Sequence, residues 1–256
     1  SVGVNASSQF EAIEKFQKME GLKKTICLIP EDLFRDEIEK GLSSTNIKLK
    51  KKYFYESDPT LLTKRIEKIT KYDRRKQNLA DEIKRVEESD EFNKEKIIEN
   101  LEKKDTLGKV DFDSVIISAF DETLKSITTS LIYTDVTPKK TYFITLNQWF
   151  DESLLNEDSS QNLYFPSINK KNFDEFKQEY FKKYSSEPNQ ISLLGFDMVG
   201  LIFYLSKIND FQLNNKVFDQ KNTFKGKIGL FEIEDKRIKH VLNFYKVENN
   251  KFKKVF

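Results

Sequence analysis

The sequence is poor in the residues from which most catalytic and metal sites are built. It contains one cysteine, one histidine and eight glycines among 256 residues. A single cysteine excludes an internal disulfide framework and any metal site that needs several cysteines. Cys27 lies within an apolar run, where a buried and unreactive thiol is expected. The lone His240 is expected at the surface, near a strand end. We therefore expect neither a metal ion nor another cofactor.

The sequence also lacks an excess of charge of either sign. Its 44 basic residues face 42 acidic ones, which leaves a formal net charge of +2. A nucleic-acid-binding domain would need a clustered basic excess, so no nucleic-acid partner is expected. No apolar run approaches the roughly 18 residues of a membrane span, and no signal peptide is visible after Ser1. We expect position 1 not to begin the gene product, so that an upstream lipid anchor would supply the link to a membrane.

Familiar enzyme motifs are missing as well. We find no Gly-x-Gly-x-x-Gly, no phosphate-binding Walker loop and no Gly-x-Ser-x-Gly elbow. Adjacent carboxylates such as Asp121-Glu122 are common, but such pairs arise by chance among 42 acidic residues. Since no nucleophile and base are paired, the chain is predicted not to be an enzyme. A hydrolase of unknown type stays open as the weakest alternative.

Strand-like and helix-like segments alternate over most of the chain. Apolar spacing predicts helices at residues 10–21, 31–42, 122–132, 172–184 and 190–208. It predicts strands at residues 23–30, 47–55, 112–119, 141–146, 162–167, 228–233 and 241–247, with a turn at Asn249-Asn250. This alternation indicates an α/β protein with a parallel sheet covered on both faces.

Residues 58–107 break this alternation. They are dense in charge, yet apolar residues recur at helical spacing on both sides of Ser89-Asp90. We predict one long amphipathic helix, a turn and a shorter return helix. The charges are interpreted either as a solvated face with i,i+4 pairs or as a helical hairpin that docks a partner. The first interpretation is favoured because runs of mixed sign seldom identify a partner.

Three predicted strands end in segments that combine aromatic and polar side chains. Ligands of open parallel sheets meet the carboxyl ends of strands, and small-molecule clefts combine an apolar wall with a few polar groups. The three segments are residues 31–35, 120–123 and 147–151. The candidate cleft residues are Phe34, Phe120, Asp121, Asn147, Gln148 and Trp149. The alternative is that the aromatic rings cap the core or face a partner.

The order of these elements resembles the type I periplasmic solute-binding fold of leucine-binding proteins. The segments that carry the resemblance are residues 5–9, 22–29, 31–34, 110–120, 176–205 and 224–229, the last similar to a Phe-x-Gly-x-x-Gly strand. Arg35 departs from the pattern, because the family has a glycine after the aromatic residue of this turn. The resemblance implies that residues 1–168 form lobe two, with a helical insertion at about 58–108. Residues 169–256 would return to lobe one and make the interlobe crossing, and the first part of lobe one would lie upstream.

Within that superfamily the chain most resembles the penicillin-binding protein activators, which are outer-membrane lipoproteins. The supporting segments are residues 72–76 (Tyr-Asp-Arg-Arg-Lys), 105–108 (Asp-Thr-Leu-Gly) and 147–149 (Asn-Gln-Trp). This likeness implies a periplasmic regulator whose partner is a penicillin-binding protein, a peptidoglycan synthase. The alternative is the substrate-binding component of an ABC importer, with a permease as partner and an amino acid or related small solute as ligand.

Overall fold

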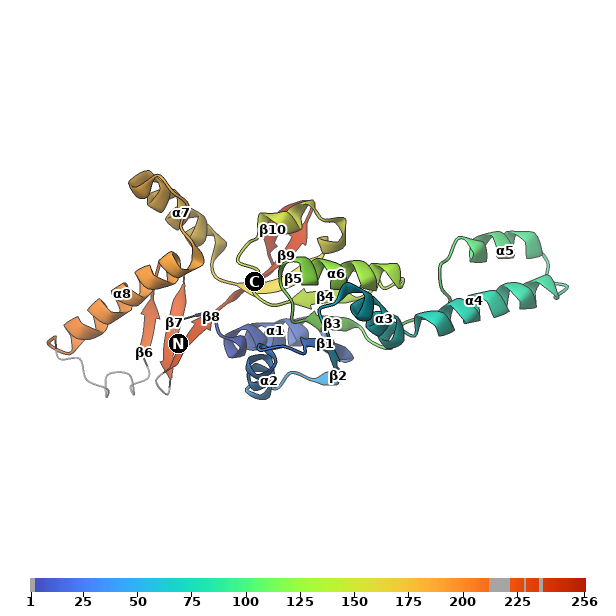
Figure 1. The fold of residues 1–256 in the computed structure, drawn as a ribbon, viewed down its shortest axis with the longest axis horizontal. Helices are drawn as coiled ribbons and strands as arrows, with labels where there is room; N and C mark the ends of the chain where they lie inside the picture. The colour runs from blue at the N-terminus through green and yellow to red at the C-terminus, as the bar shows by residue number, and fades with distance from the viewer. Residues whose placement is uncertain (1–2, 212–221, 228, 235–236) are drawn as a thin grey trace.

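The computed structural model describes residues 3–211, 222–227, 229–234 and 237–256, which form two sheets with their helices (Figure 1). The larger sheet contains β1 (Thr25–Pro30), β2 (Leu49–Tyr55), β3 (Ser114–Ile117), β4 (Tyr142–Thr145), β5 (Leu163–Ser167), β9 (Asn243–Glu248) and β10 (Lys251–Lys254). Its order is β10-β9-β5-β4-β3-β1-β2. The smaller sheet has the order β6-β7-β8, with β6 at Asn222–Lys225, β7 at Leu230–Glu234 and β8 at Arg237–Val241.

The first five strands of the larger sheet run parallel, which confirms the predicted α/β fold. β9 and β10 add to it antiparallel. Asn249 and Asn250, with φ of 52° and 56°, make the two-residue turn between them, as predicted. The strand predicted at 241–247 is instead divided, because β8 ends at Val241 and β9 begins at Asn243 in the other sheet.

Helices cover both faces of the larger sheet. α1 (Ala6–Glu20) and α2 (Arg35–Ser43) lie on one face, and α3 (Pro59–Thr70) and α6 (Asp121–Tyr133) lie on the other (Figure 1). α1 begins where the Asn5 side chain accepts a hydrogen bond from the Ser8 amide, and it ends at Gly21 in the left-handed conformation. The main core lies between these layers, and Phe10, Ile13, Phe16, Phe143 and Phe165 are among its fully buried side chains.

The charged segment contains three helices instead of the predicted two. Lys71 adopts a left-handed conformation with φ of 53°, which ends α3 and begins α4 (Tyr72–Glu87) in a new direction. α3 belongs to the main core, because Leu62 and Ile66 are buried there. α4 and α5 (Lys94–Glu102), here called the hairpin, project away from the sheet (Figure 1). The hairpin has its own apolar cluster around Leu79, Val86 and Leu101.

The polar loop after β4 contains two short 3-10 helices, η1 (Glu152–Asn156) and η2 (Asp158–Ser160). The chain then leaves β5 for α7 (Lys170–Tyr184) and α8 (Gln190–Ile208), which together with β6–β8 are here called the small unit. Gly226 is needed in this unit because a Cβ there would collide with the Phe231 ring and the Asp197 carboxylate. This close approach explains a glycine of the Phe-x-Gly-x-x-Gly segment.

Two expectations about the small unit are wrong. His240 is not at the surface, because it lies in β8 at 4% exposure, with its ring edge-on to Phe231. α8 is also long and apolar enough to cross a membrane by length and composition, with mean hydropathy of 1.6 over its best 18-residue window. The apolar residues of α8 are interrupted by Ser192, Gly195 and Asp197, so a count of consecutive apolar residues does not detect this helix.

Candidate functional site

The predicted cleft residues follow strands that end along one edge of the larger sheet. Ile117 of β3 pairs with Leu28 of β1 and with Thr145 of β4, so β3 and β4 end level with each other and β1 continues beyond them to Pro30. The segments that carry Phe34, Phe120 and Trp149 all leave the sheet at this edge. Phe120 and Trp149 therefore do not lie at opposite ends of the strands.

Phe34 and Phe120 line one small pocket of about 170 Å³ at this edge. Its remaining lining residues come from the ends of β1, β2 and β3 and from α2 and α6, and they are Pro30, Asp32, Ile38, Tyr55, Ser57, Ser118, Ala119 and Thr123. Both aromatic rings are largely accessible, Phe34 at 57% and Phe120 at 41%. Asp121, the first residue of α6, is exposed beside the pocket with φ of 47°. The pocket joins apolar rings to polar groups, as a small-molecule site requires.

Ser118 and Tyr55 are pocket residues that the sequence patterns did not identify. The buried Tyr55 hydroxyl donates to the Ser118 carbonyl at 2.9 Å, which ties the end of β2 to that of β3. Apart from the Cys27 thiol, the buried Ser118 Oγ has no hydrogen-bond partner among the described residues. A buried hydroxyl without a good partner costs about 1–3 kcal/mol. The Ser118 hydroxyl is thus a buried polar group beside this pocket whose hydrogen bonding within the described residues is incomplete.

Asn147 and Gln148 are buried and hold the strand ends together. Gln148 Nε2 donates to the Ala119 carbonyl at 3.1 Å, which connects the end of β4 to the end of β3. Asn147 Oδ1 accepts from the Trp149 amide at 3.0 Å and from Ser167 Oγ at 2.8 Å. Asn147 Nδ2 is buried and donates to no described group. Both amide side chains therefore form hydrogen bonds inside the protein that fix the ends of the strands.

Trp149 is half-buried and packs against the main core. Its φ is 49° and that of Phe150 is 58°, an uncommon left-handed pair in bulky residues. This turn directs Phe150 into an aromatic group with Phe165, Tyr245 and Phe252. Trp149 does not line the 170 Å³ pocket.

Arg35, the departure from the family pattern, does not enter the pocket. Its guanidinium lies 4.1 Å from the centroid of the Phe54 ring and pairs with Glu39 at 3.3 Å and with Glu31 at 3.9 Å. These contacts hold the cation along the side of β2, so it does not block access to Phe34.

Two side chains near this edge, Cys27 and Tyr55, are held in their protonated form by burial. Burial raises the pKa of the Cys27 thiol to about 12, so it is protonated at neutral pH. The buried Tyr55 hydroxyl also has a pKa raised by burial, with a smaller contribution from Asp32. Within the described ranges, no group of three or more His, Cys, Asp or Glu side chains could hold a metal ion.

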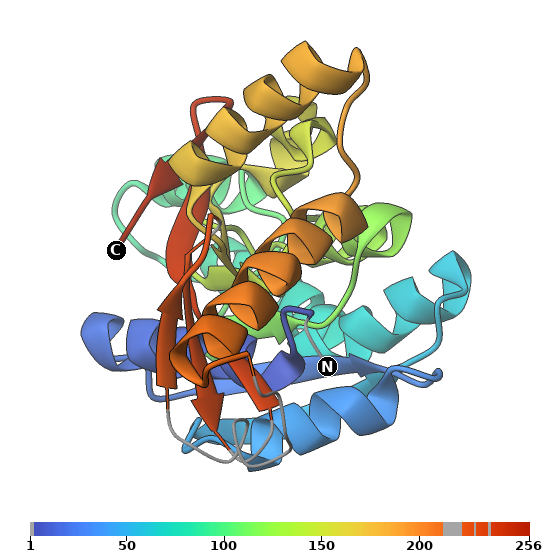
Figure 2. The same cartoon turned by 90° about the vertical axis from the view of Figure 1, so that its left-hand side faces the viewer.

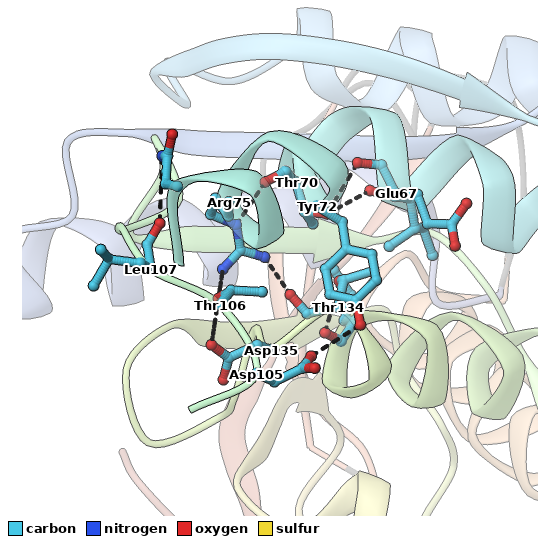
Figure 3. Close-up of polar contacts among 12 residues, drawn as sticks. Glu67, Thr70, Tyr72, Arg75, Asp105, Thr106, Leu107, Thr134 and Asp135 are labelled. Carbon is cyan, nitrogen blue, oxygen red and sulfur yellow. Dashed lines mark hydrogen bonds and ion pairs between the residues drawn. The ribbon is translucent and has the colours of Figure 1, made fainter. Parts of the chain in front are cut away.

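A second site lies at the base of the hairpin, where Arg75 is buried among oxygen acceptors (Figure 3). Its guanidinium donates to the Thr70 carbonyl and to Thr106 Oγ1, both at 3.0 Å, and to the Thr134 carbonyl. Asp135 lies 4.0 Å from the guanidinium and accepts from Thr106 Oγ1 at 2.6 Å. Burial lowers the pKa of Arg75, and the Asp135 charge opposes this effect. Arg75 thus joins α3, α4 and the end of α6.

Further contacts around Arg75 hold both ends of the hairpin. The Leu107 amide donates to the Arg75 carbonyl at 3.0 Å, which joins the chain after α5 to the first turns of α4. The Tyr72 hydroxyl donates to Asp105 at 2.9 Å (Figure 3), and the Tyr72 ring packs 5.4 Å from that of Tyr133 in α6. The hairpin is therefore held at a fixed base on the sheet-covering helices.

Solved structures of periplasmic binding proteins share this fold. The LpoA C-domain of Haemophilus influenzae, a regulator of PBP1A, matches 99% of this chain and 68% of its own, with a TM-score of 0.58 and 11% identity. Leucine-binding protein LivK of Thermotoga maritima matches 98% of this chain and 64% of its own, with a TM-score of 0.56 and 12% identity. An ABC-transporter solute-binding protein of Rhodopseudomonas palustris, in complex with 3,4-dihydroxybenzoic acid, matches 95% of this chain and 61% of its own. Its TM-score is 0.54 and its sequence identity is 11%.

These likenesses show that the chain has the type I periplasmic binding fold, which confirms the fold that the sequence resemblance implied. The neighbours are binding proteins and a regulator, and the chain spans between 61% and 68% of their lengths. No protein-family model and no curated protein sequence matches the chain.

Proposed function

We propose that this chain is part of a non-catalytic periplasmic lipoprotein that regulates peptidoglycan synthesis by docking on a penicillin-binding protein. The observation that carries the proposal is the hairpin, which projects from the binding fold and is locked at its base by Arg75 and Tyr72. A projecting element with a fixed base presents its surface at low entropic cost, which favours association. The likeness to LpoA supports the choice of partner.

The surface of the hairpin suits a protein partner. Its apolar residues are turned toward each other around Val86, and charged side chains cover its outer face. Phe92, between α4 and α5, is 90% exposed. Exposed aromatic side chains at an interface centre are typical anchors of protein–protein binding. Phe92 is therefore the residue that we expect to insert into the partner.

The test replaces residues 78–103 with a short Gly-Ser linker, which keeps Tyr72, Arg75 and Asp105. Asn78 and Leu107 lie next to each other, so the linker can close the gap without strain on α3 or α6. We expect affinity for the purified penicillin-binding protein of the same organism to fall at least about tenfold, equal to about 1.4 kcal/mol. Binding is measured by biolayer interferometry, together with glycan polymerisation by the synthase.

Phe92→Ser is the milder variant, and a double Phe34→Ala, Phe120→Ala variant is the matched control at the other site. The control should retain full affinity for the synthase. Unchanged capture after loss of the hairpin would remove the hairpin from the mechanism, and no binding by the unaltered protein would refute the regulator proposal.

The second candidate function is the capture of a small solute for an ABC importer. It is favoured by the pocket at Phe34 and Phe120, where the buried Ser118 hydroxyl has no strong partner. Titration calorimetry with amino acids and aromatic acids tests it, with Phe120→Ala and Ser118→Ala as variants. Binding heat that the unaltered protein gives and both variants lose would support import. No heat with any solute would count against it.

A further inference from the structure

A cavity of about 590 Å³ lies at the amino ends of the parallel strands, at the opposite end of the strands from the pocket at Phe34 and Phe120. Its walls come from the segments that precede β1, β3 and β4 and from the base of the hairpin. The chain returns from the hairpin to the sheet here, at Gly108. The cavity has the size of a small-molecule site, for which about 300–1,000 Å³ is usual.

Three apolar and three basic side chains give this cavity its chemical character. The apolar side chains are Val110, Phe112 and Val136. The exposed lysines Lys24, Lys109 and Lys140 line it from three different segments. In the part of the chain that the structure describes, these lysine side chains form no ion pair and donate no hydrogen bond. Cations that gather at a cavity without counter-charges raise its positive potential and attract anions.

Asp113, one of the two carboxylates in the lining, is already engaged with the main chain. Its Oδ2 atom accepts hydrogen bonds from the Lys23 and Lys24 amides at 2.9 and 3.0 Å, and its Oδ1 atom accepts from Ser114 Oγ at 2.8 Å. The Tyr142 amide donates to the Asp113 carbonyl at 2.9 Å. These contacts connect the beginnings of β1, β3 and β4, so the cavity is formed before any ligand arrives.

The other carboxylates near the lysines are engaged as well. Asp135 lines the cavity, accepts from Thr106 Oγ1 at 2.6 Å and lies 4.0 Å from the Arg75 guanidinium. Asp111 pairs with Lys50. The positive charge of the three lysines is therefore left for a ligand.

We propose that this cavity binds a small amphipathic anion, with its apolar body against Phe112 and its anionic group beside Lys109 and Lys140, and that this ligand stabilises the base of the hairpin. Lys109 follows the hairpin in the chain, whereas Lys140 precedes a strand of the larger sheet. Arg75, which locks the base, is part of the cavity wall. A ligand that contacts both sides binds only while the base is in place, so its binding free energy opposes opening of the base. The inference does not depend on which protein the hairpin binds.

The experiment titrates the protein with 1-naphthyl phosphate, which joins an apolar ring system to a dianionic group. Inorganic phosphate and 1-naphthol are the two halves of this probe. Each half should bind at least about tenfold more weakly, because it lacks either the apolar or the electrostatic contribution. Binding is measured by titration calorimetry at low ionic strength, because salt screens exposed charges.

Two matched pairs of lysines locate the binding site. Lys109→Gln with Lys140→Gln removes two charges of the cavity, whereas Lys104→Gln with Lys139→Gln removes two charges just outside its lining. All four side chains are exposed, so both variants should keep the fold. The cavity variant should weaken binding of 1-naphthyl phosphate at least about tenfold, and the outer variant less than about twofold.

Hydrogen exchange measures the effect on the hairpin. With 1-naphthyl phosphate at about 100 times its dissociation constant, the base should open at least about tenfold less often, and α4 amides near Arg75 should exchange correspondingly more slowly. The small unit, in front in Figure 2, lies at the opposite end of the molecule from the hairpin (Figure 1). Its amides should exchange at an unchanged rate.

The proposal is overturned if the unaltered protein binds no 1-naphthyl phosphate, or if the two lysine variants bind it equally well. Binding that leaves the exchange of α4 unchanged would overturn the link to the hairpin. Loss of synthase binding in the cavity variant, without any binding of the small anion, would assign Lys109 and Lys140 to a protein contact and also overturn the proposal. Deletion of the hairpin tests the proposed function separately, because it leaves both lysines in place.

Discussion

The hairpin and the small unit extend from opposite ends of the larger sheet (Figure 1), and they bury their apolar residues in different ways. In the hairpin, α4 and α5 turn their apolar residues toward each other and leave a charged exterior. In the small unit, α8 remains apolar on the side that the described residues leave uncovered. The difference teaches that the hairpin buries its apolar residues within itself, whereas α8 keeps large apolar side chains exposed on the described part of the chain.

The largest expected effect concerns the base of the hairpin. Arg75→Ala leaves the Thr70 and Thr134 carbonyls and Thr106 Oγ1 without their buried donor. We expect the free energy of opening the hairpin to fall by about 3 kcal/mol, since truncating one partner leaves buried polar groups unsatisfied. Native-state hydrogen exchange of α4 and α5 measures it. Arg74→Ala, at the exposed neighbouring position, should have almost no effect, and equal losses for the two variants would contradict the assignment.

One substitution made at two valines tests the comparison directly. Val86 is fully buried in the hairpin, and Val199 is 68% exposed on α8. Val86→Ala should lower the free energy of opening the hairpin by about 1–2 kcal/mol, because it leaves a cavity. Val199→Ala in the 256-residue chain should be neutral or slightly stabilising, because alanine has the higher helix propensity. Urea denaturation and hydrogen exchange measure the stability changes of the two variants. A large loss of stability in Val199→Ala would mean that the outward face of α8 is already covered.

The pH dependence of the hairpin provides a smaller effect. Burial, assisted by the hydrogen bond to Asp105, raises the pKa of Tyr72 from its ordinary value of 10.0 to about 12. A raised folded-state pKa contributes stability that is fully present below pH 10 and is lost as the pH rises toward 12. Hydrogen exchange becomes too fast at this pH, so near-ultraviolet circular dichroism is followed from pH 9 to 12. The wild-type loss should exceed that of Tyr72→Phe, and identical profiles would exclude Tyr72 as the cause.

The smallest effect is expected on the charged exterior. Lys103 pairs with Glu99 at 2.6 Å, and both side chains are about two-thirds exposed. Lys103→Ala should change the stability of the hairpin by less than about 0.5 kcal/mol, because solvent screens such pairs. Thermal denaturation provides the measurement. A loss of several kcal/mol would show that the exterior charges stabilise the hairpin, which would weaken their interpretation as a contact surface.

The sequence predicted the fold well where periodicity alone decides the structure. The buried run 25–30 and the apolar stripe of α1 were both recognised from their spacing, although α1 begins at Ala6 and not at residue 10. The break between α3 and α4 at Lys71 was not predicted, because lysine has no preference for the left-handed conformation that it adopts there. His240 was misplaced because its burial depends on Phe231 and Ser8, which only the folded chain brings to it.

For the candidate site, position along the chain was more informative than residue type. The rule that ligands meet strand ends found Phe34 and Phe120, which do share a pocket. It could not tell that Gln148 would direct its amide inward to the Ala119 carbonyl, because an amide at a strand end serves either role. Ser118 and Tyr55 were not predicted as pocket residues, because their placement arises from pairing between strands that are distant in sequence.

A single residue joins the two sheets between β8 and β9. Leu242 alone separates Val241 of one sheet from Asn243 of the other, and the chain is extended on both sides. Near this junction, Asn5 donates to the Ile238 carbonyl and Ser8 Oγ accepts from the His240 amide, so the start of α1 is fastened to β8. Because α1 also packs on the larger sheet, these two hydrogen bonds connect the two sheets a second time, independently of the peptide bonds around Leu242. Loss of the Asn5 or Ser8 side chain would therefore weaken the attachment of β8 without breaking the chain.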